Sequence, residues 1–320
     1  MRKTAEPRLD ELPTEQLNPA SYDLDLKSSL EIAQIINSED AKVAAVVERA
    51  LPQIARGIDW IAEALANRGR LIYVGTGTSG RIAALDASEC PPTFNVTPST
   101  VQFVMAGGVR ALSRATEADE DSRELGMREM RKKKPGKKDV VVGIAASGRT
   151  PFTVAAIECA RKTGARTIAL ACNTNSPLEK AAELAIVVES GPEVVAGSTR
   201  MKAGTAEKMV LNMLSTGAMV RLGYVYGNLM VNLHQKNTKL TERAITIVAR
   251  ALGTDREQAR SALHLAGKDV PIAIVMAKGA VSRASAERYL RDSRGHVRRA
   301  IAAASSNMTK TNYKYKGVQT

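Results

Sequence analysis

Apolar residues in the middle of the chain fall into short runs that alternate with longer amphipathic stretches. The strand-like runs are 71–75, 101–105, 139–144, 166–171 and 184–188. The helix-like stretches are 79–88, 109–116, 120–132, 151–163 and 176–182. Strands and helices that alternate at this spacing predict an α/β fold with a doubly wound, mostly parallel sheet flanked by helices. Ligands of such folds bind beyond the carboxyl ends of the strands.

The regions before and after this alternating segment have a different pattern of apolar and polar residues. Residues 1–29 have no periodicity and predict an extended arm, whereas residues 30–66 predict two helices with a kink or break at Pro52. A methionine-rich stretch at 198–222 predicts a long helix, and capping signals after residue 250 predict a small helical bundle. The predicted domains are an arm at 1–29, an α/β domain with N-terminal helices at 30–244, a helical domain at 245–304 and a disordered tail at 305–320.

Composition restricts the class of protein. A chain of 320 residues that is 44% hydrophobic can form one large and one small domain. Three cysteines without CxxC spacing argue against a disulfide framework and for the cytoplasm. The polar N-terminus predicts no signal peptide, and no apolar stretch reaches the length of a membrane span. The net charge of +13 suits anionic ligands, but the basic stretch 128–138 lacks interleaved aromatic residues, so no nucleic-acid partner is expected.

The sequence GTGTSG, residues 75–80, lies between a predicted strand and a predicted helix that Pro91 and Pro92 are expected to end. Its backbone N–H groups, its hydroxyls and the positive end of the helix dipole suit a phosphate. The spacing also satisfies GxGxxG, which in dinucleotide sites is followed about 20 residues later by an acid. The second predicted strand ends in Val104-Met-Ala-Gly-Gly108 without a carboxylate, which argues against a nicotinamide cofactor.

A second hydroxyl-rich turn, Ala145–Thr150, follows the strand at 139–144. Thr78 and Ser79 of the first turn should converge with Ser147 and Thr150 of the second at one edge of a parallel sheet. Hydroxyls and N–H groups in this number suit a phosphomonoester. Any one of these hydroxyls alone is equally well explained as a helix cap, but that explanation fits both turns together less well.

Several motifs are more specific than these general strand–turn–helix patterns: GTGTSGR, DASECPPTF, GIAASGRTPF and EVVAGSTRMKAGTAEKMVLNMLSTG. They closely resemble those of the N-acetylmuramic acid 6-phosphate etherases, a branch of the sugar isomerase (SIS) family, over roughly residues 14–304. The resemblance implies that residues 30–244 form a SIS sugar-phosphate domain. It also implies a cofactor-free lyase that removes D-lactate from N-acetylmuramic acid 6-phosphate by elimination and water addition, in recycling of cell-wall amino sugars. The helical domain resembles a ubiquitin-associated fold.

The resemblance also implies roles for individual residues. Glu89 would be the proton donor to lactate, and Glu120 the base at C2. The reaction removes one proton from C2 and delivers one to the lactate oxygen. At least two carboxyl groups, one ionised and one protonated, are therefore expected in the site. Spacing alone does not separate Glu120 from Glu117 or Glu124. The residues expected to bind substrate or its phosphate are Thr78, Ser79, Ser147, Gly148, Thr150, Arg200, Lys202 and Thr205.

Which substrate group Arg200, Lys202 and Thr205 contact stays open: phosphate, lactyl carboxylate or ring oxygen. None of the three histidines has metal-ligand spacing, so no metal is expected, and the resemblance implies that no cofactor is needed. The resemblance implies a homodimer. Two other functions remain open on the same fold: a non-catalytic regulator that senses a sugar phosphate, and an aldose–ketose sugar phosphate isomerase.

Overall fold

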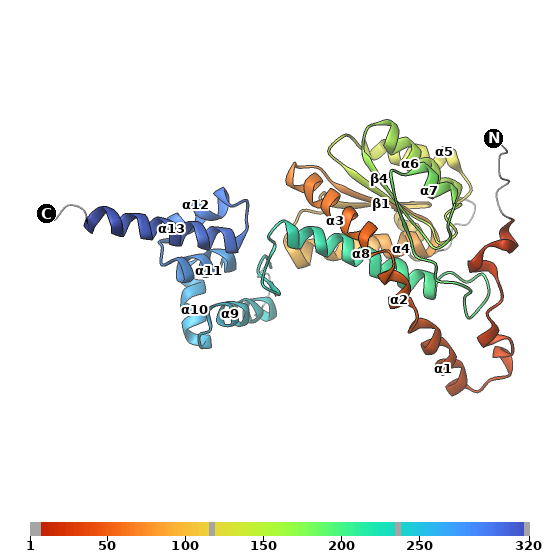
Figure 1. Cartoon of the computed structure of the whole chain (residues 1–320), viewed down its shortest axis with the longest axis horizontal. Helices are drawn as coiled ribbons and strands as arrows, with labels where there is room; N and C mark the ends of the chain where they lie inside the picture. Colours follow the sequence, from red (N-terminus) through yellow and green to blue (C-terminus); the bar gives the residue numbers. More distant parts are fainter. Residues whose placement is uncertain (1–7, 115–118, 234–237, 317–320) are drawn as a thin grey trace. The chain divides into compact units, whose positions relative to one another are not determined.

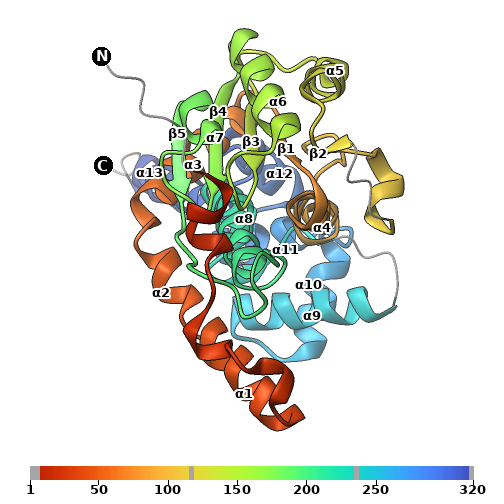
Figure 2. The same cartoon turned by 90° about the vertical axis from the view of Figure 1, so that its right-hand side faces the viewer.

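Five parallel strands form one sheet in the computed structural model, which describes residues 8–114, 119–233 and 238–316. Glu117, His234 and the outer ends of the predicted arm and tail lie outside the described residues. The strands are β1 (Leu71–Gly75), β2 (Val101–Met105), β3 (Val140–Ile144), β4 (Arg166–Ala171) and β5 (Leu184–Val187). Their order is β2-β1-β3-β4-β5 (Figure 2). This sheet confirms the predicted α/β fold.

The strand order defines a switch point. β1 pairs with both β2 and β3, and Gly75 at its carboxyl end lies opposite Ile144 at the end of β3. Chain connections therefore leave β1 and β3 toward opposite directions of the sheet, and ligands of doubly wound folds bind beyond such a pair of strand ends. Both hydroxyl-rich turns begin there.

Helices cover both faces of the sheet (Figure 1). They are α3 (Leu51–Ala66), α4 (Gly77–Phe94), α5 (Arg123–Lys133), α6 (Pro151–Lys162), α7 (Pro177–Ala181) and α8 (Lys202–Arg221). Because side chains alternate along a strand, Ile72 and Val74 pack with α5, α6 and α7 in one cluster. Tyr73 points to the other face, where its hydroxyl reaches α4. All five residues of β1 and of β3 are buried, as expected for a sheet covered on both sides.

The N-terminal segment precedes the sheet. In the described part of the predicted arm, from residue 8 onward, four 3-10 turns lie at Leu9–Glu11, Pro13–Glu15, Pro19–Ser21 and Leu24–Leu26. Ser28 and Glu31 then form a capping box at the start of α1 (Ser29–Asp40). The break predicted at Pro52 is confirmed: α2 (Val43–Glu48) ends before it, and Pro52 lies in the first turn of α3, where its missing N–H costs little.

Contacts divide the chain into two units, Met1–Ser88 with Thr97–Gly217, and Glu89–Val96 with Ala218–Thr320. Most of the second unit is helical. Its elements are β6 (Val225–Tyr226), β7 (Leu229–Met230), α9 (Thr238–Leu252), α10 (Arg256–Leu265), α11 (Val270–Gly279), α12 (Arg283–Asp292) and α13 (Val297–Lys316). Ile245, Val248, Leu263 and Ile274 are among its buried core. The helix α13 continues into the stretch after residue 304 for which the sequence predicts disorder.

The expected end of α4 at the proline pair is wrong. The helix includes Pro91 and Pro92 and continues to Phe94, and Asn95, with φ of 57°, ends it in the left-handed conformation. Phe94 is buried and packs edge-to-face on Tyr224, with ring centroids 6.4 Å apart. This packing holds the last turn in place against the local preference of proline.

Two predictions near Glu120 are also wrong. The helix predicted at 109–116 is a short 3-10 turn, Gly108–Leu112, in its described part. The helix predicted from Glu120 begins at Arg123, because Ser122 accepts a hydrogen bond from the Leu125 N–H and caps it. Glu120 therefore precedes the helix.

Cys90, Cys159 and Cys172 are free and buried. Within the described ranges, no helix has the length and apolar character that crossing a membrane requires.

Candidate active site

The first turn joins β1 tightly to α4. The Gly80 N–H donates to the Thr76 carbonyl at 2.9 Å, and a Cβ on Gly80 would lie 2.9 Å from the Gly75 carbonyl oxygen. Only glycine permits this close approach of strand and helix. Gly77, with φ of 49°, opens α4, so the N–H groups of its first turn lie directly beyond the strand. Thr78 is half-buried, and Ser79 is buried in this turn.

The second turn follows β3 in the same way. Gly148 has φ of 66°, and an added Cβ would lie 2.4 Å from Ser176 Oγ. The half-buried Ser147 accepts a hydrogen bond through Oγ from the Arg149 N–H at 3.2 Å, so its hydroxyl hydrogen is not used in that bond. Thr150 is the N-cap of α6 but, within the described chain, its side chain forms no capping hydrogen bond. The turn thus offers hydroxyls that helix capping does not consume.

Glu120 lies beside the first turn and the start of α6, which follows the second turn. Its carbonyl accepts a hydrogen bond from the Phe152 N–H at 3.0 Å, which ties it to the start of α6. Its Oε1 lies 3.2 Å from the position that a Cβ on Gly77 would occupy, so the half-buried carboxylate lies over the start of α4. Glu124, which spacing alone did not separate from Glu120, is exposed in the first turn of α5. The structure therefore brings Glu120 together with the two turns.

The start of α8 packs beside the first turn. A Cβ on Gly204 would lie 3.4 Å from the Thr78 methyl group. Arg200 and Thr205 are exposed at this end of the helix. Glu193 fixes the helix start, because its buried carboxylate accepts the N–H groups of Lys202 and Ala203 at 3.0 and 2.9 Å. The capped start of α8, next to Gly204, thus lies against Thr78.

Lys202 has a different environment from Arg200. Its Nζ is buried and donates to Glu39 Oε2 of α1 at 2.6 Å, and both side chains are at most 5% exposed. Asn18 of the arm donates to the same oxygen at 3.0 Å, and Lys42 pairs with the other. Although burial opposes ionisation, these donors lower the pKa of Glu39 to about 2. In this structure, Lys202 ties the arm and α1 to the start of α8.

Glu39→Gln should destabilise the first unit by roughly 3–5 kcal/mol at pH 7, because it leaves the buried Lys202 ammonium without its carboxylate. The Glu39 pKa is depressed, so its contribution is complete above the unfolded value of 4.5 and is lost as the pH falls toward 2. The deficit of the variant should therefore shrink between pH 5 and about pH 2. Urea unfolding followed by the fluorescence of Trp60, the single tryptophan, measures it. Exposed Glu48→Gln is the control; an equal, pH-independent loss in both variants would contradict this assignment.

Glu89 is exposed in α4 and belongs to the second unit. Three residues earlier, Asp86 is buried and accepts hydrogen bonds from the Tyr73 hydroxyl, Asn212 Nδ2 and the Ser215 hydroxyl, at 2.8, 2.7 and 3.1 Å. Burial raises the pKa of Asp86 despite these three donors. The bonds fix the rotation of this part of α4 against β1 and α8.

Sequence reasoning gave no role to Asp86, Glu193 or Glu207. All three are carboxyl residues at buried positions, and Glu207 of α8 accepts a hydrogen bond from the Ser79 hydroxyl. The available signal was an acidic residue within a run of small side chains, as in AGTAE, residues 203–207.

Comparison with known proteins first shows the class of protein to which the chain belongs. Residues 53–161 match the model described as the glucokinase regulatory protein N-terminal SIS domain, and residues 126–217 match the SIS domain model. A solved structure of a phosphoheptose isomerase from Neisseria gonorrhoeae is similar with a TM-score of 0.47 and 16% identity, over 60% of this chain and 98% of that one. The sheet, the two turns and the two family-model matches define a SIS-domain protein.

Curated relatives narrow the class. An N-acetylmuramic acid 6-phosphate etherase of Symbiobacterium thermophilum is 55% identical over 83% of this chain and 89% of its own length. One from Clostridium botulinum (strain Langeland) is 48% identical over 93% and 98%, and N-acetylmuramic acid 6-phosphate etherase 1 of Vibrio cholerae is 47% identical over 92% and 98%. The chain belongs to the N-acetylmuramic acid 6-phosphate etherase family.

Proposed function

We propose that this protein is a carbon–oxygen lyase that cleaves the D-lactyl ether of N-acetylmuramic acid 6-phosphate, giving N-acetylglucosamine 6-phosphate and D-lactate. The observation that carries the proposal is the position of Glu120, whose carboxylate lies over the start of α4 and whose backbone is bonded to the start of α6. A base in that position is adjacent to the two turns proposed to bind the phosphate. Identity near 50% with etherases over nearly the full chain supports the substrate.

The chemistry assigns one task to each carboxyl group. In the open-chain sugar, the C1 aldehyde acidifies the C2–H bond, and the Glu120 carboxylate takes that proton. The C3–O bond breaks, and protonated Glu89 supplies a proton to the departing lactate oxygen. This leaves an α,β-unsaturated aldehyde, Glu120 protonated and Glu89 ionised. Water then adds at C3: Glu89 takes its proton and Glu120 returns one to C2, which restores both groups.

The phosphate would bind beyond the carboxyl ends of β1 and β3. Its ligands are proposed to be Thr78, Ser79, Ser147, Gly148 and Thr150, together with first-turn N–H groups of α4 and α6. Arg200 and Thr205 are proposed to contact another anionic group of the substrate, such as the lactyl carboxylate. For Lys202, which is ion-paired with Glu39, contact with substrate would require that pair to open.

Incubation of the purified protein with N-acetylmuramic acid 6-phosphate, with assays for D-lactate and for the sugar product, tests the proposal. Stoichiometric lactate and N-acetylglucosamine 6-phosphate are expected. Binding without lactate release would instead indicate a sugar-phosphate sensor, and a ketose phosphate without lactate would indicate an isomerase. Either result would overturn the lyase function.

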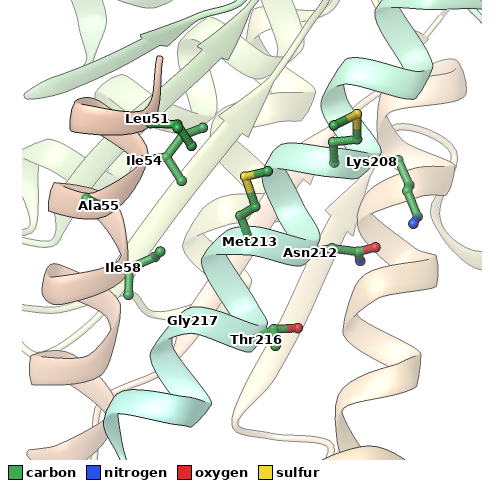
Figure 3. A pocket seen from close by; sticks show the side chains of 10 residues that line it. Leu51, Ile54, Ala55, Ile58, Lys208, Asn212, Met213, Thr216 and Gly217 are labelled. Carbon is green, nitrogen blue, oxygen red and sulfur yellow. The ribbon is translucent and has the colours of Figure 1, made fainter. Parts of the chain in front are cut away.

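We also propose that the protein is a homodimer of the cytoplasm. Support comes from a groove of about 640 Å³ between α3 and α8, walled by apolar side chains that include Ile54, Ile58 and Met213 (Figure 3). Apolar side chains are also largely exposed on the arm and α1, including Tyr22 and Leu26 at 70% and 80%. Apolar surface of this extent is typical of protein interfaces. The buried free cysteines are compatible with a reducing compartment.

Light scattering should give a mass of twice the 34.2 kDa of one chain. Met213→Asp should shift the mass to that of one chain, because it places a charge in the groove of a subunit interface. Leu265→Asp, at an apolar residue that is 66% exposed outside the groove, should remain dimeric. A dimeric Met213→Asp protein would exclude this groove as the interface.

A further inference from the structure

A buried carboxyl group lies directly behind the first phosphate turn. Glu207 of α8 is fully buried, and the Ser79 hydroxyl donates a hydrogen bond to its Oε1 at 2.8 Å. The two residues are 128 positions apart in the chain, so the contact depends on the packing of α8 against the start of α4. Ser79 is one of the hydroxyls proposed to bind phosphate. The hydrogen that phosphate would accept is therefore directed toward Glu207 in this structure.

The surroundings of Glu207 favour its neutral form. Among the described residues, its Oε2 has no hydrogen-bond partner. The titratable groups that face it are Glu193, which caps α8, and Cys172, a buried thiol. Both are groups that become negative on ionisation. Burial, with a smaller effect from the charge of Glu193, raises the pKa of Glu207 to about 8.

The protonation state of Glu207 decides what the Ser79 hydroxyl can do, because that hydroxyl has a single hydrogen. An ionised Glu207 only accepts, so it competes with phosphate for this hydrogen and also repels the phosphate dianion. A protonated Glu207 can instead donate its own hydrogen to Ser79 Oγ. The Ser79 hydrogen is then available to a phosphate oxygen.

We propose that Glu207 is a positioning residue of the phosphate site: its carboxylic acid donates to Ser79 Oγ in the substrate complex, so that the Ser79 hydroxyl donates to the phosphate. This inference rests on the proposed phosphate site. No covalent bond changes, and one proton stays on Glu207 throughout. Loss of that proton at alkaline pH should weaken the binding of any phosphomonoester at this site.

The affinity for N-acetylglucosamine 6-phosphate, measured calorimetrically from pH 7 to 9.5, tests the proposal. The phosphate is a dianion throughout this range, because its second pKa is about 6. For the wild type, the Kd should rise about tenfold between pH 7 and 9, as expected when binding requires one proton on a group with a pKa near 8. In Glu207→Gln, the side-chain amide donates to Ser79 Oγ at every pH, so the Kd should stay constant. A pH-independent wild-type Kd, or an equal rise in Glu207→Gln, would overturn the role of Glu207.

Two controls separate this role from a structural one. Glu158→Gln removes a partly exposed carboxylate on α6 that pairs with Arg123, and should keep the wild-type rise in Kd. Ser79→Ala should weaken binding at pH 7. When residue 79 is already alanine, adding Glu207→Gln should not change the pH dependence of the Kd any further. Independent effects of the two substitutions would contradict the link between Ser79 and Glu207.

A measurement on the wild type keeps the proposal testable if the variant does not fold. In protein with 13C-labelled glutamate carboxyl groups, one resonance should titrate near pH 8, and bound sugar phosphate should raise its midpoint, because binding and protonation favour each other. An unchanged midpoint would count against the proposal. Absence of both sugar-phosphate binding and lactate release in the wild type would instead refute the proposed function.

Discussion

Glu120→Gln should lower the rate of D-lactate release by about 10²–10⁴-fold, the usual contribution of a general base, because an amide cannot take the proton from C2. The same variant should lose exchange of the C2 proton with deuterated solvent. Substrate affinity should change little, since glutamine keeps the size of the side chain that lies over Gly77. Lactate assays and proton NMR of the recovered sugar measure the two effects.

Glu124→Gln is the matched control for this base. Glu124 is four residues further along the chain, exposed, and in the first turn of α5. It should keep wild-type turnover and exchange. Near-wild-type turnover in Glu120→Gln, or an equal loss in Glu124→Gln, would show that Glu120 is not the base.

Glu89→Gln should lower lactate release by a similar factor, about 10²–10⁴-fold, but for the opposite reason: no proton is available for the departing oxygen. The C2 proton should still exchange with solvent, because Glu120 remains intact. Retained exchange without lactate therefore distinguishes the proton donor from the base. Calorimetry should show that the substrate still binds.

The control for Glu89 is Glu257→Gln, an exposed acid in the first turn of α10 in the same unit. It should release lactate at the wild-type rate. Loss of C2 exchange together with lactate in Glu89→Gln would contradict the assigned division of tasks, because it would show that Glu89 acts before or during proton removal.

Much of the fold follows from periodicity that is local in the chain. Each strand of the sheet is a short apolar run, and each covering helix has an apolar stripe, so both leave a signal within about a dozen residues. Predictions from local sequence preference were wrong where contacts between distant residues opposed that preference. Phe94 packs on Tyr224, which carries α4 past a proline pair.

The two turns of the candidate site could be predicted from the sequence, but the residues that hold the site residues in place could not. The hydroxyls of Ser79 and Ser147 and the glycine at 148 are visible as motifs after strands. The partners of Ser79 and Lys202 are not visible, because Glu207 and Glu39 lie 128 and 163 positions away and carry no spacing that identifies them. Glu120 lies before α5 because Ser122 caps that helix. The sequence alone did not show which residue would be the cap.

The arm contacts have a consequence for how the chain folds. Glu39 meets Lys202 across 163 positions, and Asn18 meets the Pro192 carbonyl across 174. Contacts of such separation close a long loop and slow folding, whereas the strands and helices between them form from nearer partners. During synthesis, the N-terminal arm emerges first but must wait for Lys202 before its buried pair can form. The start of α8, which holds Arg200 and Thr205, is therefore completed late, by the part of the chain made earliest.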